Sequence, residues 1–190
     1  MNVSAYPELR LDSYEQVRER PGDNEEQEKY SSAKKSNHTF KSQMIILPKG
    51  QDIVDVVAVE PSLTSDITLF REYHSKFDPK QRFKGDKAYI GEDVIATPIK
   101  KPRNRKLTPE QKEQNKAFSA KRIFVKHRIR SVKIFRVVQE RFRLNSHKYE
   151  QVTLTTCGLV RLGIGSLDIT SINISDITQL KLTHITKHFG

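Results

Sequence analysis

Alternating apolar and polar positions near the start of the chain predict a short β-strand over residues 8–13. Its apolar side chains are Leu9 and Leu11, and Asp12 stands at its end. Residues 14–37 are polar and charged, with a Pro-Gly pair in their middle. We interpret this stretch as a surface loop.

Two β-rich runs follow, at 39–47 and 52–59. The four residues that join them include a glycine, so the pattern predicts an antiparallel hairpin whose second strand stops at Pro61. Ser65 is then well placed to cap a helix that extends to Phe77.

The strongest helix signal comes after a basic, proline-containing linker at 98–106. Thr108 supplies an N-cap, Pro109 occupies the first helical position and Glu110 places an acid in the first turn. An apolar stripe then predicts a helix that continues to about Phe142. The members of the stripe are Phe118, Val125, Ile129 and Val132.

The remaining segments complete a mixed pattern. A short strand is expected over 81–85, ending at Asp86. Residues 151–162 fit either a helix or a strand, and residues 166–190 form a tail of uncertain structure. The order of strand, hairpin, helix, strand and helix predicts an α/β fold with one domain over residues 1–165.

Composition narrows the class of protein. Hydrophobic residues make up 35% of the chain and charged residues 30%, which is compatible with a globular core. Apolar runs of bilayer-spanning length and the pattern of a signal peptide are both absent from the sequence. With Cys157 as the single cysteine, an intramolecular disulfide is excluded, and the six histidines show no zinc spacing. We therefore expect a cytoplasmic protein without a membrane partner.

The net charge of +11 comes from one basic block. Residues 100–150 contain 17 Lys and Arg against 4 Asp and Glu, a net +13, and the rest of the chain holds 17 against 19, a net −2. The block could be only the solvated face of a helix. A polyanion partner is favoured, because a concentrated positive surface gains free energy by releasing counterions from phosphate backbones.

Two aspartates stand at the ends of predicted strands and are candidates for chemistry. Asp12 follows the first strand, and Asp86 follows the strand at 81–85. Each alone is more typical of a turn residue or a helix cap. Together, ahead of a basic helix, they suggest a metal site, because paired carboxylates hold Mg²⁺ while leaving water on it for phosphate chemistry.

Seven segments resemble, in the same order, those of the insertion-sequence DDE transposases. Leu11-Asp12-Ser13-Tyr14 is similar to the segment of the first aspartate, and Gly85-Asp86-Lys87 to that of the second. The resemblance covers residues 9–167. Its segments are 11–16, 28–41, 60–66 with 69–71, 85–91, 101–102 with 107–112, the Arg122, Lys133, Phe135 and Arg136 positions of one helix, and 157–159.

The resemblance implies a ribonuclease-H-like mixed sheet with flanking helices, and a catalytic domain over residues 1–165. In the intact family, two aspartates and a glutamate hold two Mg²⁺ (or Mn²⁺) ions, which cut and join phosphodiesters at transposon ends. By position, Asp12 and Asp86 are the catalytic and metal-binding aspartates, and Asp66 is a weaker candidate. The implied partner is double-stranded DNA in a bacterial nucleoid. DNA contacts fall to Arg122, Lys126, Arg130, Lys133 and Arg136.

Two departures from the family pattern bear on activity. Lys126 stands where the family has the third carboxylate, so a metal ligand is replaced by a positive charge. In addition, Asp12 lies close to the start of the chain, so we expect the family's front DNA-binding domain to be absent.

Three interpretations follow from these observations. The first is a transposase catalytic domain by descent that no longer cuts DNA. The second is a basic, non-catalytic nucleic-acid-binding protein, in which Lys126, Arg130 and Lys133 only contact phosphates. The third is an active nuclease that recruits another acid, Asp66 or Glu60. The oligomeric state is left open.

Overall fold

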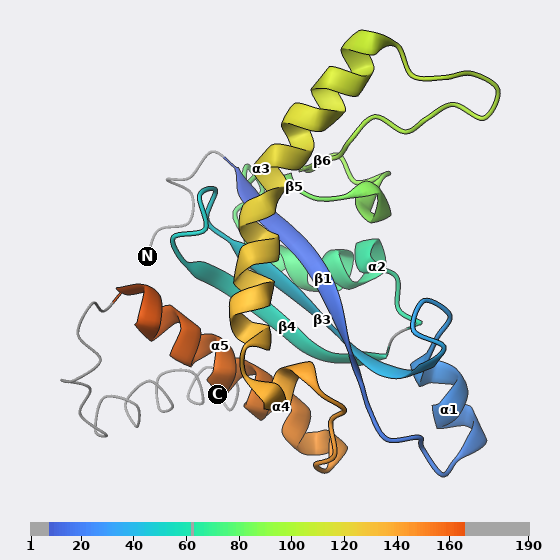
Figure 1. Cartoon of the computed structure of the whole chain (residues 1–190), viewed down its shortest axis with the longest axis vertical. Coiled ribbons are helices and arrows are strands. Elements are labelled where there is room, and N and C mark those ends of the chain that lie inside the picture. The colour runs from blue at the N-terminus through green and yellow to red at the C-terminus, as the bar shows by residue number, and fades with distance from the viewer. Residues whose placement is uncertain (1–7, 62, 166–190) are drawn as a thin grey trace.

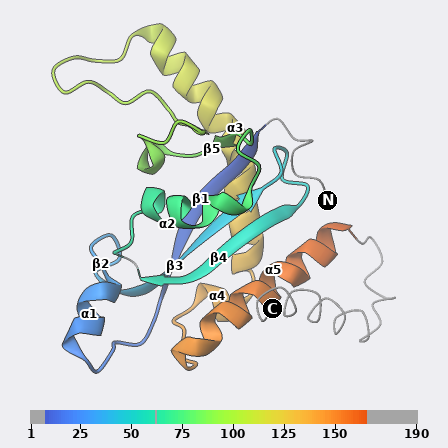
Figure 2. The same ribbon diagram turned by 180° about the vertical axis from the view of Figure 1, so that it is seen from behind.

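The computed structural model describes residues 8–61 and 63–165, and within them a mixed sheet forms the centre of the molecule (Figure 1). Helices cover both faces of this sheet, as the front and back views show (Figures 1 and 2). The strands are β1 (Leu9–Val17), β2 (Ser31–Ser32), β3 (Asn37–Ile46), β4 (Ile53–Pro61), β5 (Phe83–Lys84) and β6 (Ile95–Ala96).

Antiparallel and parallel pairings divide the sheet into two parts. β3 pairs antiparallel with both β1 and β4, which confirms the predicted hairpin. β5 pairs parallel with β1, and β6 pairs parallel with β5. The short β2 adds to the start of β3. This mixed α/β arrangement agrees with the expected fold class and is consistent with a ribonuclease-H-like fold.

The helices and their lengths follow local signals in several places. Ser65 caps α2 through the amide of Thr68, as predicted, and Thr108 forms a reciprocal capping box with Gln111 at the start of α3. The helices are α1 (Asn24–Tyr30), α2 (Asp66–Tyr73), α3 (Pro109–Lys133), α4 (Arg136–Gln139) and α5 (Tyr149–Gly165). The 3₁₀ turns are η2 (His74–Lys76), η3 (Lys87–Tyr89) and η4 (Ser146–Lys148).

Strand alternation sends successive residues of β1 to opposite faces. Tyr14 packs in a core cluster with Val125 and Val132 of α3, whereas Leu11 belongs to the cluster that contains Phe70 of α2. Helices α3, α4 and α5 all contribute to the first cluster, and α2 to the second. Asp12, two residues before Tyr14, therefore lies on the α3 face of the sheet.

The segment at 14–37 corrects the prediction of a surface loop. β1 continues to Val17, and α1 and β2 follow it. α1 has no fully buried residue, in keeping with its polar sequence from Asn24 to Lys29; only Tyr30 at its end packs against Phe40. Asp12 is consequently an interior residue of β1 rather than its end.

The long helix is shorter than predicted, because it ends at Lys133 rather than near Phe142. The backbone of Phe135 is extended, and the chain then turns back toward the sheet. The amide of Phe142 donates to the carbonyl of Val17 at 2.7 Å, and its buried ring contacts Phe40. Residues 151–162, left ambiguous by the sequence, lie within α5, and the predicted tail at 166–190 lies outside the described residues.

The beginning of α3 and the strand-free segment before it form an arm, which we define as residues 99–124. The arm projects from the body of the molecule (Figure 1). None of its residues is buried, whereas Pro98 and Val125 on either side are. Among the described helices, none is both long and apolar enough to cross a membrane.

Candidate functional site

The parallel pairing of β1 with β5 brings the two candidate aspartates to the same level. Arg10 lies opposite Lys84 in this pairing. Asp12 comes two residues after Arg10, and Asp86 comes two residues after Lys84. Asp12 is fixed by its strand and accepts a hydrogen bond from the amide of Ser13 at 3.0 Å. Asp86 follows β5 and caps η3, accepting from the amide of Ala88 at 2.8 Å. Asp86 thus acts as a helix cap and also faces Asp12.

The guanidinium of Arg122 lies between these two carboxylates. One terminal nitrogen, Nη2, is 3.1 Å from Oδ2 of Asp12 and 3.8 Å from Oδ2 of Asp86. The side chains of Arg122 and Asp12 are only 11% and 15% exposed. Sequence reasoning assigned Arg122 to DNA contact and missed this contact. The available signal was spacing, since a residue four positions before Lys126 lies on the same side of the helix.

The pKa of Asp12 is shifted by burial and by the charged groups around it. Burial raises the pKa of its carboxyl above the ordinary 3.8. Arg122 opposes that rise, Asp86 adds to it, and Lys126, the smallest of these influences, lowers the pKa. Lys126 itself is exposed on α3, so its ammonium acts on Asp12 mainly through the field of its charge.

Asp66 lies on the other face of the sheet. It begins α2 and forms an ion pair with Lys41 of β3 at 3.1 Å. Its backbone carbonyl also accepts from Gln43, which bonds to Tyr89 beneath α2. The structure therefore brings Asp12 and Asp86 together and keeps Asp66 apart from them.

The residues at this site do not fit the two-metal arrangement that the resemblance implies. Within 8–61 and 63–165, no group of three or more His, Cys, Asp or Glu side chains is arranged to hold a metal ion. The two carboxylates present already share a guanidinium, whose positive charge stands where a cation would need to approach. A divalent ion would have to displace Arg122 to reach both carboxylates.

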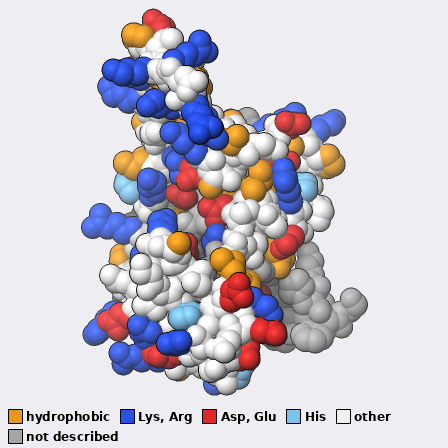
Figure 3. Space-filling view, turned by 90° about the vertical axis from the view of Figure 1, so that its right-hand side faces the viewer, with side chains coloured by type: hydrophobic (Ala, Val, Ile, Leu, Met, Phe, Trp, Pro, Cys, Tyr) orange, Lys and Arg blue, Asp and Glu red, His pale blue; other side chains and the backbone are white. Residues whose placement is uncertain are grey.

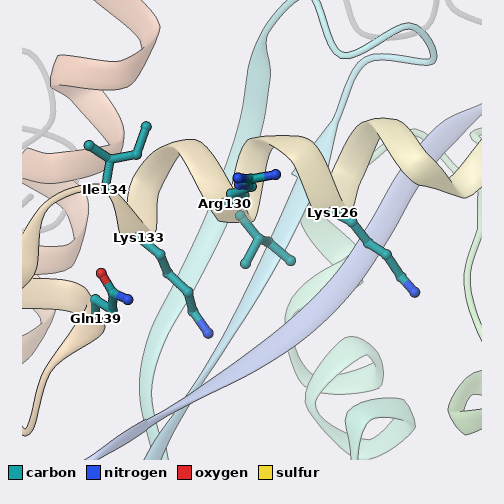
Figure 4. A pocket seen from close by; sticks show the side chains of 6 residues that line it. Lys126, Arg130, Lys133, Ile134 and Gln139 are labelled. Carbon is teal, nitrogen blue, oxygen red and sulfur yellow. The ribbon is translucent and has the colours of Figure 1, made fainter.

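A basic hollow lies along the second half of α3, beside Asp12 and Asp86, which we call the acidic pair. It has a volume of about 360 Å³ and is shown in Figure 4. Lys126 and Lys133 extend to the same side of the helix there (Figure 4). Its lining residues are Lys126, Ile129, Arg130, Lys133, Ile134 and Gln139.

Positive charge is concentrated at the Lys133 end of the hollow. Burial lowers the pKa of Lys133, and the charges of Lys35 and Lys34 lower it further. The Lys133 ammonium also lies 5.1 Å from the centre of the Tyr14 ring. Arg136, the other predicted DNA contact, instead pairs with Glu140 on the exposed surface at 2.7 Å.

Two comparisons with known proteins bear on the family of this chain. A family model described as "DDE superfamily endonuclease" matches residues 11–161. The chain is 35% identical over 142 residues to a protein of Microchaete diplosiphon described as "Probable transposase for insertion sequence element IS702". That alignment covers 73% of this chain and 50% of the relative, so the chain spans about half the length of the curated relative that it matches.

No solved structure gave a significant match to the chain. The family match nevertheless includes both aspartates of the acidic pair, all of α3 and most of α5. The chain therefore belongs to the DDE superfamily endonucleases of the insertion-sequence transposase type.

Proposed function

We propose that this chain binds double-stranded DNA through the basic surface of α3 and does not cut it. The observation that carries the proposal is the position of Arg122, which contacts Asp12 at 3.1 Å and Asp86 at 3.8 Å. DDE superfamily endonucleases generally use divalent metal ions. In this chain the guanidinium of Arg122 already neutralises part of the charge of Asp12 and Asp86.

Charge balance at the site explains why metal binding should be weak. Asp12 and Asp86 carry two negative charges, and Arg122 and Lys126 carry two positive charges. The site is therefore neutral, whereas a carboxylate at position 126 would give it a charge of −2. A divalent cation gains little Coulomb energy at a neutral site and must also lose water.

Phosphate binding is favoured by the same charges. Lys126, Arg130 and Lys133 line one hollow, and Lys34 and Lys35 add to the field at Lys133. A phosphate backbone would relieve the repulsion among these positively charged side chains while releasing its own counterions. This interaction would read no base sequence, and would hold the protein on bulk DNA, as expected for a nucleoid-associated protein.

DNA binding is tested with a labelled duplex of random sequence. Fluorescence anisotropy should show binding at low salt, and the logarithm of the affinity should fall by about 0.9 for each neutralised phosphate per unit of log salt concentration. Absence of binding at low salt, or an affinity independent of salt, would overturn the DNA-binding part of the proposal.

The loss of cleavage is tested with Mn²⁺ and three variants. Lys126→Glu should bind Mn²⁺ at least about tenfold more tightly than the parent by calorimetry, because it changes the site charge by −2. Adding Asp12→Ala to this variant should remove the gain. Lys121→Glu makes the same charge change at an exposed position of α3 outside the acidic pair and should behave as the parent.

A nicking assay on supercoiled DNA completes the test. The parent should leave the plasmid intact in Mn²⁺. If instead the parent nicks DNA and Asp12→Ala abolishes the activity, the acidic pair is catalytic as it stands. That result would contradict the proposal that the chain does not cut.

A further inference from the structure

Apart from Arg122, the arm belongs neither to the acidic pair nor to the basic hollow. Residues 99–124 carry eight lysines and arginines and two acidic residues, apart from Arg122. All eight basic side chains are exposed. Figure 3 shows Lys and Arg side chains gathered over the projecting end of the molecule. They are Lys100, Lys101, Arg103, Arg105, Lys106, Lys112, Lys116 and Lys121.

Specific contacts hold the arm together. Asn115 of α3 accepts from the amide of Ile99 at 2.8 Å and donates to its carbonyl at 3.0 Å, which fastens the incoming segment to the helix. Nearer the body, the Phe118 ring lies 5.4 Å from the ammonium of Lys84. The capping box at Thr108 fixes the first turn. The arm therefore presents its charges in a defined geometry.

The charges of the arm continue the line of charges in the hollow. With 3.6 residues per turn, Lys112 and Lys116 fall on the same side of α3 as Lys126, Arg130 and Lys133, within about 100° of arc. From Lys112 to Lys133 the line is roughly 32 Å long. One turn of B-form DNA has a comparable length of about 34–36 Å. Lys121 points to the opposite side of the helix.

We propose that the arm is a second DNA-contact surface, on which Lys112 and Lys116 extend the duplex path beyond the hollow to about one turn of DNA. The inference rests on the DNA binding proposed above and adds a separate site to it. Its support is charge complementarity, since a line of cations about as long as one turn of DNA faces a partner that carries phosphates along its whole length.

The test compares duplexes of about 10 and about 24 base pairs. Both are long enough to cover the hollow and the arm, and the longer one can do so in many registers. Lys112→Gln with Lys116→Gln should weaken binding of the longer duplex and lower its salt slope by about 2, one unit for each lost phosphate contact. Lys116→Gln alone should lower the slope by about 1. Lys121→Gln, an equal loss of charge on the opposite side, should leave the slope at the parent value. All of these side chains are exposed, so the variants should keep the parent circular dichroism spectrum.

Outcomes separate the two proposals. If Arg130→Gln with Lys133→Gln weakens binding but the Lys116→Gln and Lys112→Gln/Lys116→Gln variants behave as Lys121→Gln does, DNA binding stands and the arm inference is wrong. If the parent binds neither duplex at low salt, the proposed function itself fails, and the arm inference fails with it.

Discussion

Arg122 of α3 donates to Asp12 of β1 across 110 residues of sequence, at 3.1 Å. The contact fastens α3 to the sheet beside Asp12 and Asp86, the two aspartates that the sequence predicts to be catalytic. A side chain outside the expected carboxylate set thus governs the site. Removal of the Arg122 side chain should therefore lower the stability of the fold.

Arg122→Gln should lower the free energy of unfolding by about 2 kcal/mol, because it leaves two carboxylates side by side with one of them largely buried. Urea titration followed by circular dichroism measures the change. Lys121→Gln is the control on the same helix and should stay within about 0.5 kcal/mol of the parent. Equal stability of all three proteins would mean that the ion pair contributes nothing to the fold.

The pH dependence of stability should carry the signature of Asp12. Burial raises the pKa of this carboxyl above its ordinary 3.8, more than Arg122 lowers it. Because the folded state holds the proton more tightly than the unfolded chain, this contribution to stability is fully present below pH 3.8 and is lost as the pH rises through the raised pKa. Asp12→Asn cannot titrate. The unfolding free energy of the parent minus that of the variant should therefore fall as pH rises across this window.

Urea titrations at a series of pH values give that difference directly. A difference that grows with pH would show that the Arg122 charge outweighs burial at Asp12, contrary to expectation.

Gly85→Ala should destabilise the turn that carries Asp86. A Cβ atom at position 85 would lie 2.7 Å from Cδ2 of Tyr89 and 3.1 Å from Cγ2 of Ile95, and both neighbours are buried. We expect a loss of about 1–3 kcal/mol in unfolding free energy, measured by thermal or urea denaturation. Gly158→Ala is the matched control. It lies in α5 with nothing within 4 Å of its added Cβ, and should gain roughly 0.5–1 kcal/mol. Equal effects at both positions would contradict the packing described around Gly85.

Local signals in the sequence were sufficient for the hairpin and for the starts of α2 and α3. A cap at Ser65 and another at Thr108 act within one helical turn, so no distant contact is needed to read them. The full length of β1 was not predictable in this way. Gln16 looks like a loop residue, yet it is buried because its amide donates to the carbonyls of Val137 and Glu140 at 2.8 and 2.7 Å.

The end of α3 could not be predicted either, because it too depends on a contact between residues far apart in the sequence. The helical pattern continues past Lys133, but Ile134 is 75% exposed there, and the chain turns so that Phe142 can reach the sheet. At the candidate site, the sequence suggested that Asp12 and Asp86 lie close together. The spacing of Arg122, four residues before Lys126, indicated only which side of the helix it lies on. Whether its side chain reaches the two carboxylates depends on how α3 crosses β1.

The unbroken course of α3 gives the molecule a mechanical property. Helices bend sharply at proline, at glycine-serine pairs or where a turn is widened, and α3 has proline only at its first position and no glycine. Lys112 lies about 15 Å along the axis from Arg122. The helix is therefore stiff between Lys112 and the part held in the core by Val125 and Val132. A tilt of about 10° at Arg122 would displace Lys112 by roughly 3 Å. A substitution that removes the Arg122–Asp12 contact should therefore also change the position of Lys112 relative to the sheet.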